Sequence, residues 1–191
     1  MNIDGKNVLL RQLAKDDIAE IHSKASQYEG VSKYFTTKIR TRQYWEKRFD
    51  ETGLWDETYG MLKIIAKEDS ELVGVIWYFR SLPYAEGLEI GFNIFDQTKR
   101  GRGLIAEVVK IFTAYLFYTY PIPRIQFNTL VDISDDKHLA YARSLGFTYE
   151  GAMRKAMFIR GKYIDLQLFS ALREEYPSLD TTLENIHAAA R

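Results

Sequence analysis

The chain has no cysteine and no long apolar run. The missing cysteine excludes disulfides, thiolate metal sites and a cysteine nucleophile, and it fits a reducing compartment. No stretch approaches the roughly 20 apolar residues that a membrane-spanning helix needs. Residues 1–10 carry charges where a signal peptide would be apolar. We therefore expect a cytoplasmic protein that does not bind a membrane.

The chain also has no formal net charge, because 26 Lys and Arg residues balance 26 Asp and Glu residues. This balance gives no reason to expect a nucleic-acid partner. The sequence shows no internal repeat and no low-complexity block, and 191 residues are enough for one domain with a substantial core. We expect a single domain over residues 1–176, followed by a polar C-terminal tail or a loosely docked helix over 177–191.

Strand and helix patterns alternate along the chain. Runs of branched and aromatic residues predict strands, and apolar residues spaced three to four apart predict helices. The clearest helix follows Gly103, because Leu104, Val108, Phe112 and Leu116 recur every four residues and predict one broad buried face. The pattern indicates a mixed α/β fold with strand–helix–strand units at its centre. The predicted strands cover residues 8–13, 59–66, 72–79, 88–95, 124–131, 148–159 and 163–172, and the predicted helices cover 16–25, 41–53, 104–118 and 135–145.

The most informative segment is the strand-like run 88–95 and the basic turn after it, Lys99-Arg100-Gly101-Arg102-Gly103. Such a turn leaves backbone N–H groups free at the start of the next helix, where they attract phosphate. Its cationic side chains favour an anion as well. The turn therefore predicts a ligand that carries phosphate.

The glycine pair by itself leaves three interpretations open. The first is a tight turn that leads into a buried helix and binds nothing. The second is a nicotinamide dinucleotide, because Gly101 to Ala106 fits G-x-G-x-x-A and Asp132 is a possible ribose acceptor. The position of the turn in the chain argues against a dinucleotide, because that fingerprint normally opens a nucleotide-binding domain and here about half of the chain precedes it. Only about 60 residues follow Val131, too few for the rest of a doubly wound sheet. The third is an acyl-CoA.

A family resemblance favours the acyl-CoA. The segment Arg100 to Leu104 resembles the pyrophosphate loop of GNAT N-acetyltransferases, Q/R-x-x-G-x-G/A, with Ile105 in place of the last Gly or Ala. Residues 135–147 are similar to the family's N-x-x-S-x-x-x-x-x-x-L-G-F helix. Further likeness to the branch that acetylates ribosomal-protein N-termini lies in residues 10–13, Asp17, residues 150–151, Arg154 and residues 161–165. The resemblance covers roughly residues 7 to 175.

The resemblance implies a fold and a way of holding acetyl-CoA. We expect a mostly antiparallel mixed sheet of about seven strands, flanked by about four helices and splayed next to the cofactor strand. The pantetheine arm would pair with the backbone of Asn93, Ile94 and Phe95. Asp135 stands where the family has an Asn that commonly touches the cofactor, and its other interpretation is a helix cap. The turn residues that would hold the pyrophosphate are Lys99, Arg100, Gly101, Arg102, Gly103 and Leu104.

The resemblance also assigns catalytic candidates for direct attack of an amine on the thioester. Glu89 lies 11 residues before Arg100, at the family's general-base position. The other interpretation of Glu89 is a surface or salt-bridging strand residue. His138 is a candidate to protonate the leaving thiolate, with Tyr141 as a weaker one, because Ala142 occupies the position of the family's usual Tyr. The other interpretation of His138 is a half-buried side chain in core packing.

The resemblance implies that the acceptor is a primary amine on a protein N-terminus or a small molecule, and the sequence does not choose between them. Its walls are expected from residues 28–55 and the last hairpin, with Tyr34, Phe35, Trp77 and Tyr84 as candidates. A homodimer fits the branch, and no residue pattern predicts a metal site. An acyl-CoA sensor without catalytic activity is the alternative to the enzyme, and a NAD-dependent enzyme is a remote one.

Overall fold

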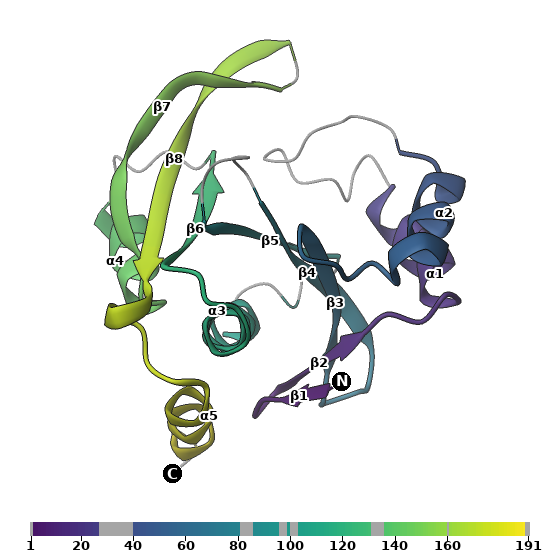
Figure 1. Cartoon of the computed structure of the whole chain (residues 1–191), viewed down its shortest axis with the longest axis horizontal. Coiled ribbons are helices and arrows are strands. Elements are labelled where there is room, and N and C mark those ends of the chain that lie inside the picture. Colours follow the sequence, from purple (N-terminus) through teal and green to yellow (C-terminus); the bar gives the residue numbers. More distant parts are fainter. Residues whose placement is uncertain are drawn as a thin grey trace.

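One parallel pair of strands interrupts an otherwise antiparallel sheet. The computed structural model describes residues 2–26, 40–80, 86–95, 99, 103–130, 136–159 and 161–189. Within them eight strands form one sheet in the order β1-β2-β3-β4-β5-β6-β8-β7 (Figure 1), and only β5 and β6 run parallel. The strands are β1 (Asn2–Asp4), β2 (Val8–Gln12), β3 (Tyr59–Ala66), β4 (Leu72–Phe79), β5 (Leu88–Ile94), β6 (Arg124–Thr129), β7 (Thr148–Ile159) and β8 (Lys162–Leu172).

Helices cover both faces of this sheet. Figure 1 shows α1 and α2 on one side, and α3 and α5 on the other. The ends of α2 follow from its sequence, because the Thr41 side chain accepts a hydrogen bond from the Tyr44 amide and Gly53 ends the helix at a φ of 65°. The helices are α1 (Asp17–Ala25), α2 (Arg42–Thr52), α3 (Leu104–Thr119), α4 (Asp136–Ser144), the 3-10 helix η2 (Arg173–Glu175) and α5 (Leu179–Ala188).

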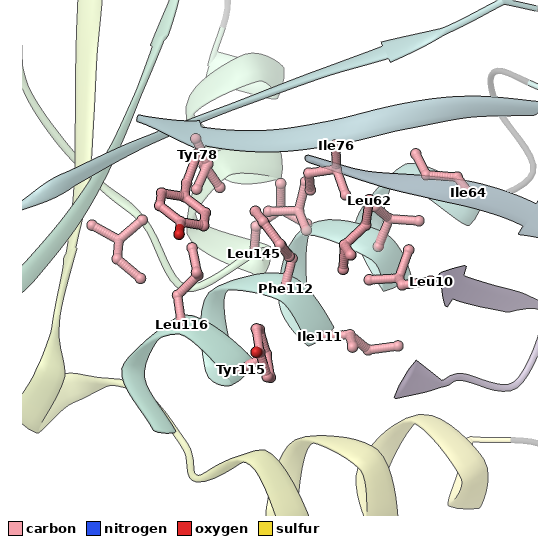
Figure 2. Packing of buried hydrophobic residues seen from close by; sticks show 14 of the residues in the cluster. Leu10, Leu62, Ile64, Ile76, Tyr78, Ile111, Phe112, Tyr115, Leu116 and Leu145 are labelled. Carbon is pink, nitrogen blue, oxygen red and sulfur yellow. The ribbon is translucent and has the colours of Figure 1, made fainter. Parts of the chain in front are cut away.

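The main core lies between the sheet and α3. Figure 2 shows strand side chains such as Leu62 and Ile76 packed against Ile111, Phe112 and Leu116 of α3. Eleven residues of α3 are buried, which exceeds the single face that its four-residue repeat predicts. The reason is that the sheet packs on one side of α3 and α5 packs on another. A second, smaller cluster lies under α1 and α2 and contains Leu13, Leu54, Met61 and Val75.

Side-chain hydrogen bonds fix both ends of α3. Near its amino end, the buried Glu107 carboxylate accepts hydrogen bonds from the Asn7 amide at 2.9 Å, the Asn7 side chain at 2.8 Å and the Val8 amide at 3.3 Å. At its carboxyl end, Arg173 donates to the carbonyls of Phe117 at 2.7 Å, Ile122 at 2.8 Å and Tyr120. Both contacts satisfy backbone groups that a turn or a helix end leaves unpaired.

The mixed α/β fold is confirmed, with two additions to the predicted elements. Strand β1 adds an edge to the sheet, and its three residues are too few to show a sequence period. Residues 179–188 form α5, whose Leu179, Leu183 and Ile186 pack against the main core. The alternative of a docked helix for the last segment therefore describes it better than a polar tail.

Candidate functional site

Strands β5 and β6 separate soon after they meet. Among the described residues they pair only at Leu88 with Ile125 and at Glu89 with Gln126. Strand β5 keeps its pairing with β4 as far as Ile94. This is the predicted splay next to the cofactor strand, and it leaves one edge of β5 without a neighbouring strand beyond Glu89.

The backbone groups of β5 point alternately toward β4 and toward the splay. Phe95 donates its amide to the Val73 carbonyl of β4 at 2.9 Å. Since hydrogen-bonding positions alternate in an antiparallel pair, Asn93 also faces β4, and Ile94 faces the splay. Of the three residues predicted to bind the pantetheine arm through their backbone, only Ile94 is directed at that edge. The pairing of β4 with β5 therefore argues against the backbone of Asn93 and Phe95 as binding partners of the pantetheine arm.

The amino end of α3 lies after β5 in the chain. Gly103 precedes the helix with a φ of 75°, a conformation that favours glycine, and no atom lies within 4 Å of the place where its Cβ would be. The first amides of α3, beginning at Leu104, have no carbonyl partner within the helix and form its positive end. Arg100, Gly101, Arg102 and Asp135 lie outside the described residues.

Lys99 is held by acidic residues of another turn. It is buried and forms ion pairs with Asp69 and with Glu71, the second at 3.0 Å. Hydrogen bonds to Asp69 and Glu71 raise the pKa of Lys99 above its ordinary value. Lys99 therefore ties the segment before α3 to the β3–β4 turn, and its contact with a phosphate remains a prediction.

Glu89 lies where β5 and β6 separate. Burial raises the pKa of its carboxyl above the ordinary value, while hydrogen bonds from Gln126 and Asn128 act in the opposite direction. Gln126 Nε2 donates to Glu89 Oε2 at 3.2 Å. A glutamate whose pKa is raised toward neutrality is better matched to proton transfer than one at its ordinary value.

The partners of Glu89 belong to a longer polar row on β6 and the last hairpin. Arg124 forms an ion pair with Glu150 at 2.9 Å and also approaches the Gln126 side-chain oxygen at 3.4 Å. Ser170 donates to Glu150 at 2.5 Å. Glu89 is thus joined through Gln126 to Arg124 and Glu150, and it forms no ion pair of its own among the described residues. The salt-bridging interpretation of Glu89 does not hold within that part of the chain.

Trp77 shares the face of the sheet that carries Glu89. It pairs across β4 and β5 with Gly91, and a Cβ at Gly91 would lie 2.6 Å from the Trp77 indole. The glycine therefore lets the indole lie against β5, two residues from Glu89. The side-chain oxygens of Asn93 and Asn128 are buried without a hydrogen-bond partner among the described residues. Of the predicted acceptor walls, Tyr34, Phe35 and Tyr84 lie outside those residues.

His138 and Tyr141 are exposed on α4. The buried side of this helix carries Ala142, and Leu145 is buried directly after the helix ends. Leu139 packs against the core beside them. The half-buried packing role for His138 is therefore wrong, because the helix turns that side chain to the surface. Ala142 is buried and has no group to donate a proton. The two exposed side chains remain candidates for that role.

The described part of the chain contains neither a candidate metal site nor a candidate membrane-spanning helix. No group of three or more His, Asp or Glu side chains there has a geometry that would hold a metal ion. None of the helices described is both long enough and apolar enough to cross a membrane.

The sequence of the chain matches known acetyltransferases. The profile of the acetyltransferase (GNAT) domain family matches residues 7–148. Ribosomal-protein-serine acetyltransferase of Escherichia coli K12 is 28% identical over 114 residues, which are 60% of this chain and 62% of that protein. The chain thus aligns with less than two thirds of that relative. The probable N-acetyltransferase YjcK of Bacillus subtilis is 26% identical over 91% of this chain and 98% of its own length.

Solved structures share the fold. Spermidine N-acetyltransferase from Vibrio cholerae, in complex with CoA and spermine, superposes with a TM-score of 0.73 at 18% identity over 89% of this chain and 98% of its own. Ribosomal-protein-S5-alanine acetyltransferase from Vibrio fischeri gives a TM-score of 0.74 at 16% identity, over 93% of this chain and 99% of its own. From the match of the family profile to residues 7–148 we conclude that this chain belongs to the acetyltransferase (GNAT) domain family.

Proposed function

We propose that this enzyme moves an acetyl group from acetyl-CoA to a primary amine by direct attack, with Glu89 as the general base. The observation that carries this proposal is the position of Glu89. It is a half-buried carboxylate with a raised pKa and two amide donors, at the point where β5 and β6 separate. An ammonium has no lone pair, so an acceptor needs such a group to take its proton before attack.

The donor would lie in the splay between β5 and β6. Its pyrophosphate would accept hydrogen bonds from the first amides of α3, from Gly103 and Leu104 onward, where the helix dipole is positive. The cationic side chains of Arg100 and Arg102 would add charge. The pantetheine arm would lie along the edge of β5 that faces away from β4. A thioester carbonyl held there would be near backbone donors that stabilise the oxyanion.

The chemistry balances without a covalent enzyme intermediate. The amine nitrogen forms a bond to the carbonyl carbon, the carbon–sulfur bond breaks, and Glu89 takes the proton of the amine directly or through water. The CoA thiolate then takes a proton, for which we propose His138, with Tyr141 three residues along α4 or water as the alternatives. Ribosomal-protein and spermidine acetyltransferases are both among the similar proteins, and each acts on an amine.

The direct test is release of CoA thiol from acetyl-CoA over a panel of amines and short peptides. We expect Glu89→Gln to lower kcat/KM by about 100-fold or more, as loss of a general base does. The matched control is Glu86→Gln, which removes an exposed carboxylate three residues away. Equal rates for the wild type and Glu89→Gln would remove Glu89 from the mechanism.

An acyl-CoA sensor is the second candidate function, favoured by the buried Ala142, which cannot serve as an acid. A wild-type protein that is stabilised by acetyl-CoA but releases no thiol with any amine would favour the sensor. Thermal stabilisation by NAD, and none by CoA or acetyl-CoA, would contradict both candidates. His138→Ala and Tyr141→Phe then test the proton donor, because only the residue that protonates sulfur should lower the rate substantially.

A further inference from the structure

Two arginines of the α2 region converge on one tyrosine hydroxyl. Arg40 Nη1 lies 3.5 Å from Tyr44 Oη, and Arg48 Nη1 lies 3.4 Å from the same atom. The Arg40 guanidinium carbon is 5.2 Å from the centre of the Tyr44 ring, and that of Arg48 is 4.2 Å from the Tyr59 ring. Stacking on aromatic faces holds both groups in place. We call Arg40 and Arg48 the guanidinium pair.

Within the described residues, the guanidinium pair lacks the direct ion pairs that neighbouring cations form. Arg42 forms an ion pair with Glu46 at 2.7 Å, and Lys47 lies 3.9 Å from Glu51. Neither Arg40 nor Arg48 forms an ion pair with a carboxylate in the described ranges. The charge of Arg48 also acts on Asp56, whose Oδ1 accepts hydrogen bonds from its own turn. Two like charges held together in this way favour an external anion.

The sheet register places this pair relative to Glu89. Tyr59 of β3 pairs with Phe79 of β4, and Phe79 pairs with Glu89 of β5. Directly paired residues point to the same face of a sheet, so Tyr59 and Glu89 share the face that α1 and α2 cover. Two strand spacings amount to about 10 Å. Arg48 lies over the Tyr59 ring, and the guanidinium pair therefore lies roughly that far from the proposed base.

We propose that the acceptor carries a carboxylate about two strand spacings from its amine, and that Arg40 and Arg48 bind it. This inference rests on the proposed function of Glu89 as the base. A carboxylate accepts paired hydrogen bonds from guanidinium groups in a geometry that few other anions match. An extended peptide advances about 3.5 Å per residue, so an acidic side chain at its third position can reach this distance. A polyamine would be repelled by the same pair.

The test compares acceptors that differ in one group. The peptides Ala-Ala-Glu-Ala-Ala, Ala-Ala-Gln-Ala-Ala and Ala-Ala-Lys-Ala-Ala are assayed with acetyl-CoA, alongside glutamate and spermidine. We expect kcat/KM for the Glu peptide to exceed that for the Gln peptide by about 10-fold or more, the size of a charge-assisted hydrogen bond. The preference should weaken at high salt. Free glutamate is too short to span two strand spacings between its amine and either carboxylate, so glutamate acting better than the Glu peptide would overturn the proposed spacing.

Substitutions separate the guanidinium pair from general charge. Arg48→Gln and Arg40→Gln should remove the preference, so that kcat/KM for the Glu peptide falls to the value for the Gln peptide in the same variant. Arg48→Lys keeps the charge over Tyr59 and should restore part of the preference. Arg42→Gln is the control, because Arg42 is on the same helix and already paired with Glu46. Thermal unfolding of each variant checks that α2 remains folded.

The outcomes distinguish this inference from the proposed function. Thiol release with equal use of the Glu, Gln and Lys peptides would overturn the guanidinium pair as an acceptor site and leave the acetyltransferase proposal standing. Thiol release with none of the acceptors would contradict the proposed function. Calorimetric titration of the Glu peptide then decides the inference: binding lost in Arg48→Gln and kept in Arg42→Gln supports it, and equal binding overturns it.

Discussion

Gln126 donates a hydrogen bond from Nε2 to Glu89 Oε2 at 3.2 Å, across the last pair of residues that joins β5 to β6. The contact links the geometry of the splay to the protonation of the carboxylate. The amides of Gln126 and Asn128 stabilise the charged form of Glu89, and burial opposes them and has the larger effect on its pKa.

Removing these amides should move the pH dependence of the enzyme. In Gln126→Leu or Asn128→Leu the carboxylate loses a donor, so the pKa of Glu89 should rise further above its ordinary value. The base would then be protonated over a wider acidic range, and the acid limb of log(kcat/KM) should shift to higher pH. Gln12→Leu, an exposed glutamine on β2, is the control. An acid limb that stays in place would show that Glu89 does not set it.

The burial that raises the pKa of Glu89 also predicts that its charged carboxylate lowers the free energy of unfolding at neutral pH. Because folding raises the pKa of Glu89, the folded state binds its proton more tightly, and stability falls as pH rises past the ordinary pKa of a glutamate. Glu89→Gln removes this effect. We expect the free energy of unfolding of the variant to exceed that of the wild type at pH 7, and the difference to shrink toward pH 4. Urea titrations at both pH values measure it, and a larger advantage at pH 4 would contradict this sign.

Gly103 and Gly161 form a matched pair for testing the turn before α3. Both have a positive φ, 75° and 79°, and neither has an atom within 4 Å of its Cβ position. An alanine at either site should cost about 1 kcal/mol of stability through backbone strain alone. Only Gly103→Ala should also weaken the binding of acetyl-CoA, because it would distort the backbone amides at the amino end of α3. Titration calorimetry measures this, and equal affinities in the two variants would remove Gly103 from the donor site.

Glu107 should be a structural carboxylate with no part in the reaction. It is buried and accepts three hydrogen bonds from the turn between β1 and β2. Glu107→Ala leaves these donors unpaired, and we expect the free energy of unfolding to fall by about 2–3 kcal/mol. The comparison is Glu174→Ala, at an exposed position, which should change little. A loss of rate in Glu107→Ala at full stability would contradict the structural role.

The elements were predictable where the signal is local. Strands β3 and β4 match the predicted ranges because each is an eight-residue run rich in apolar residues, with a polar turn between them. The cap at Thr41 and the stop at Gly53 are likewise local in the sequence. Strand β1 was missed because three residues carry no period, and the docking of α5 depends on α3, which lies far away in the chain.

The site was predictable only in part, for the same reason. Glu89 can be found from its spacing to the turn, but Gln126 lies 37 residues away and becomes its partner only through the parallel register of β5 and β6. Lys99 belongs to a run of cations in the sequence, and its pairing with Asp69 and Glu71 depends on the β3–β4 turn. The spacing of Tyr44 and Arg48 in the sequence places them one turn apart on the same helix, so their contact is predictable. Their place beside Tyr59 is not.

The central claim is that acetyl-CoA lies between β5 and β6 and contacts the amino end of α3. Hydrogen exchange with and without acetyl-CoA tests it most directly, because amides that bind the ligand exchange more slowly. The account predicts new protection in the segments that hold residues 88–95 and 103–106, and none in α5 or the β7–β8 hairpin turn. Protection confined to those other elements, or unchanged exchange in both predicted segments at saturating ligand, would contradict it.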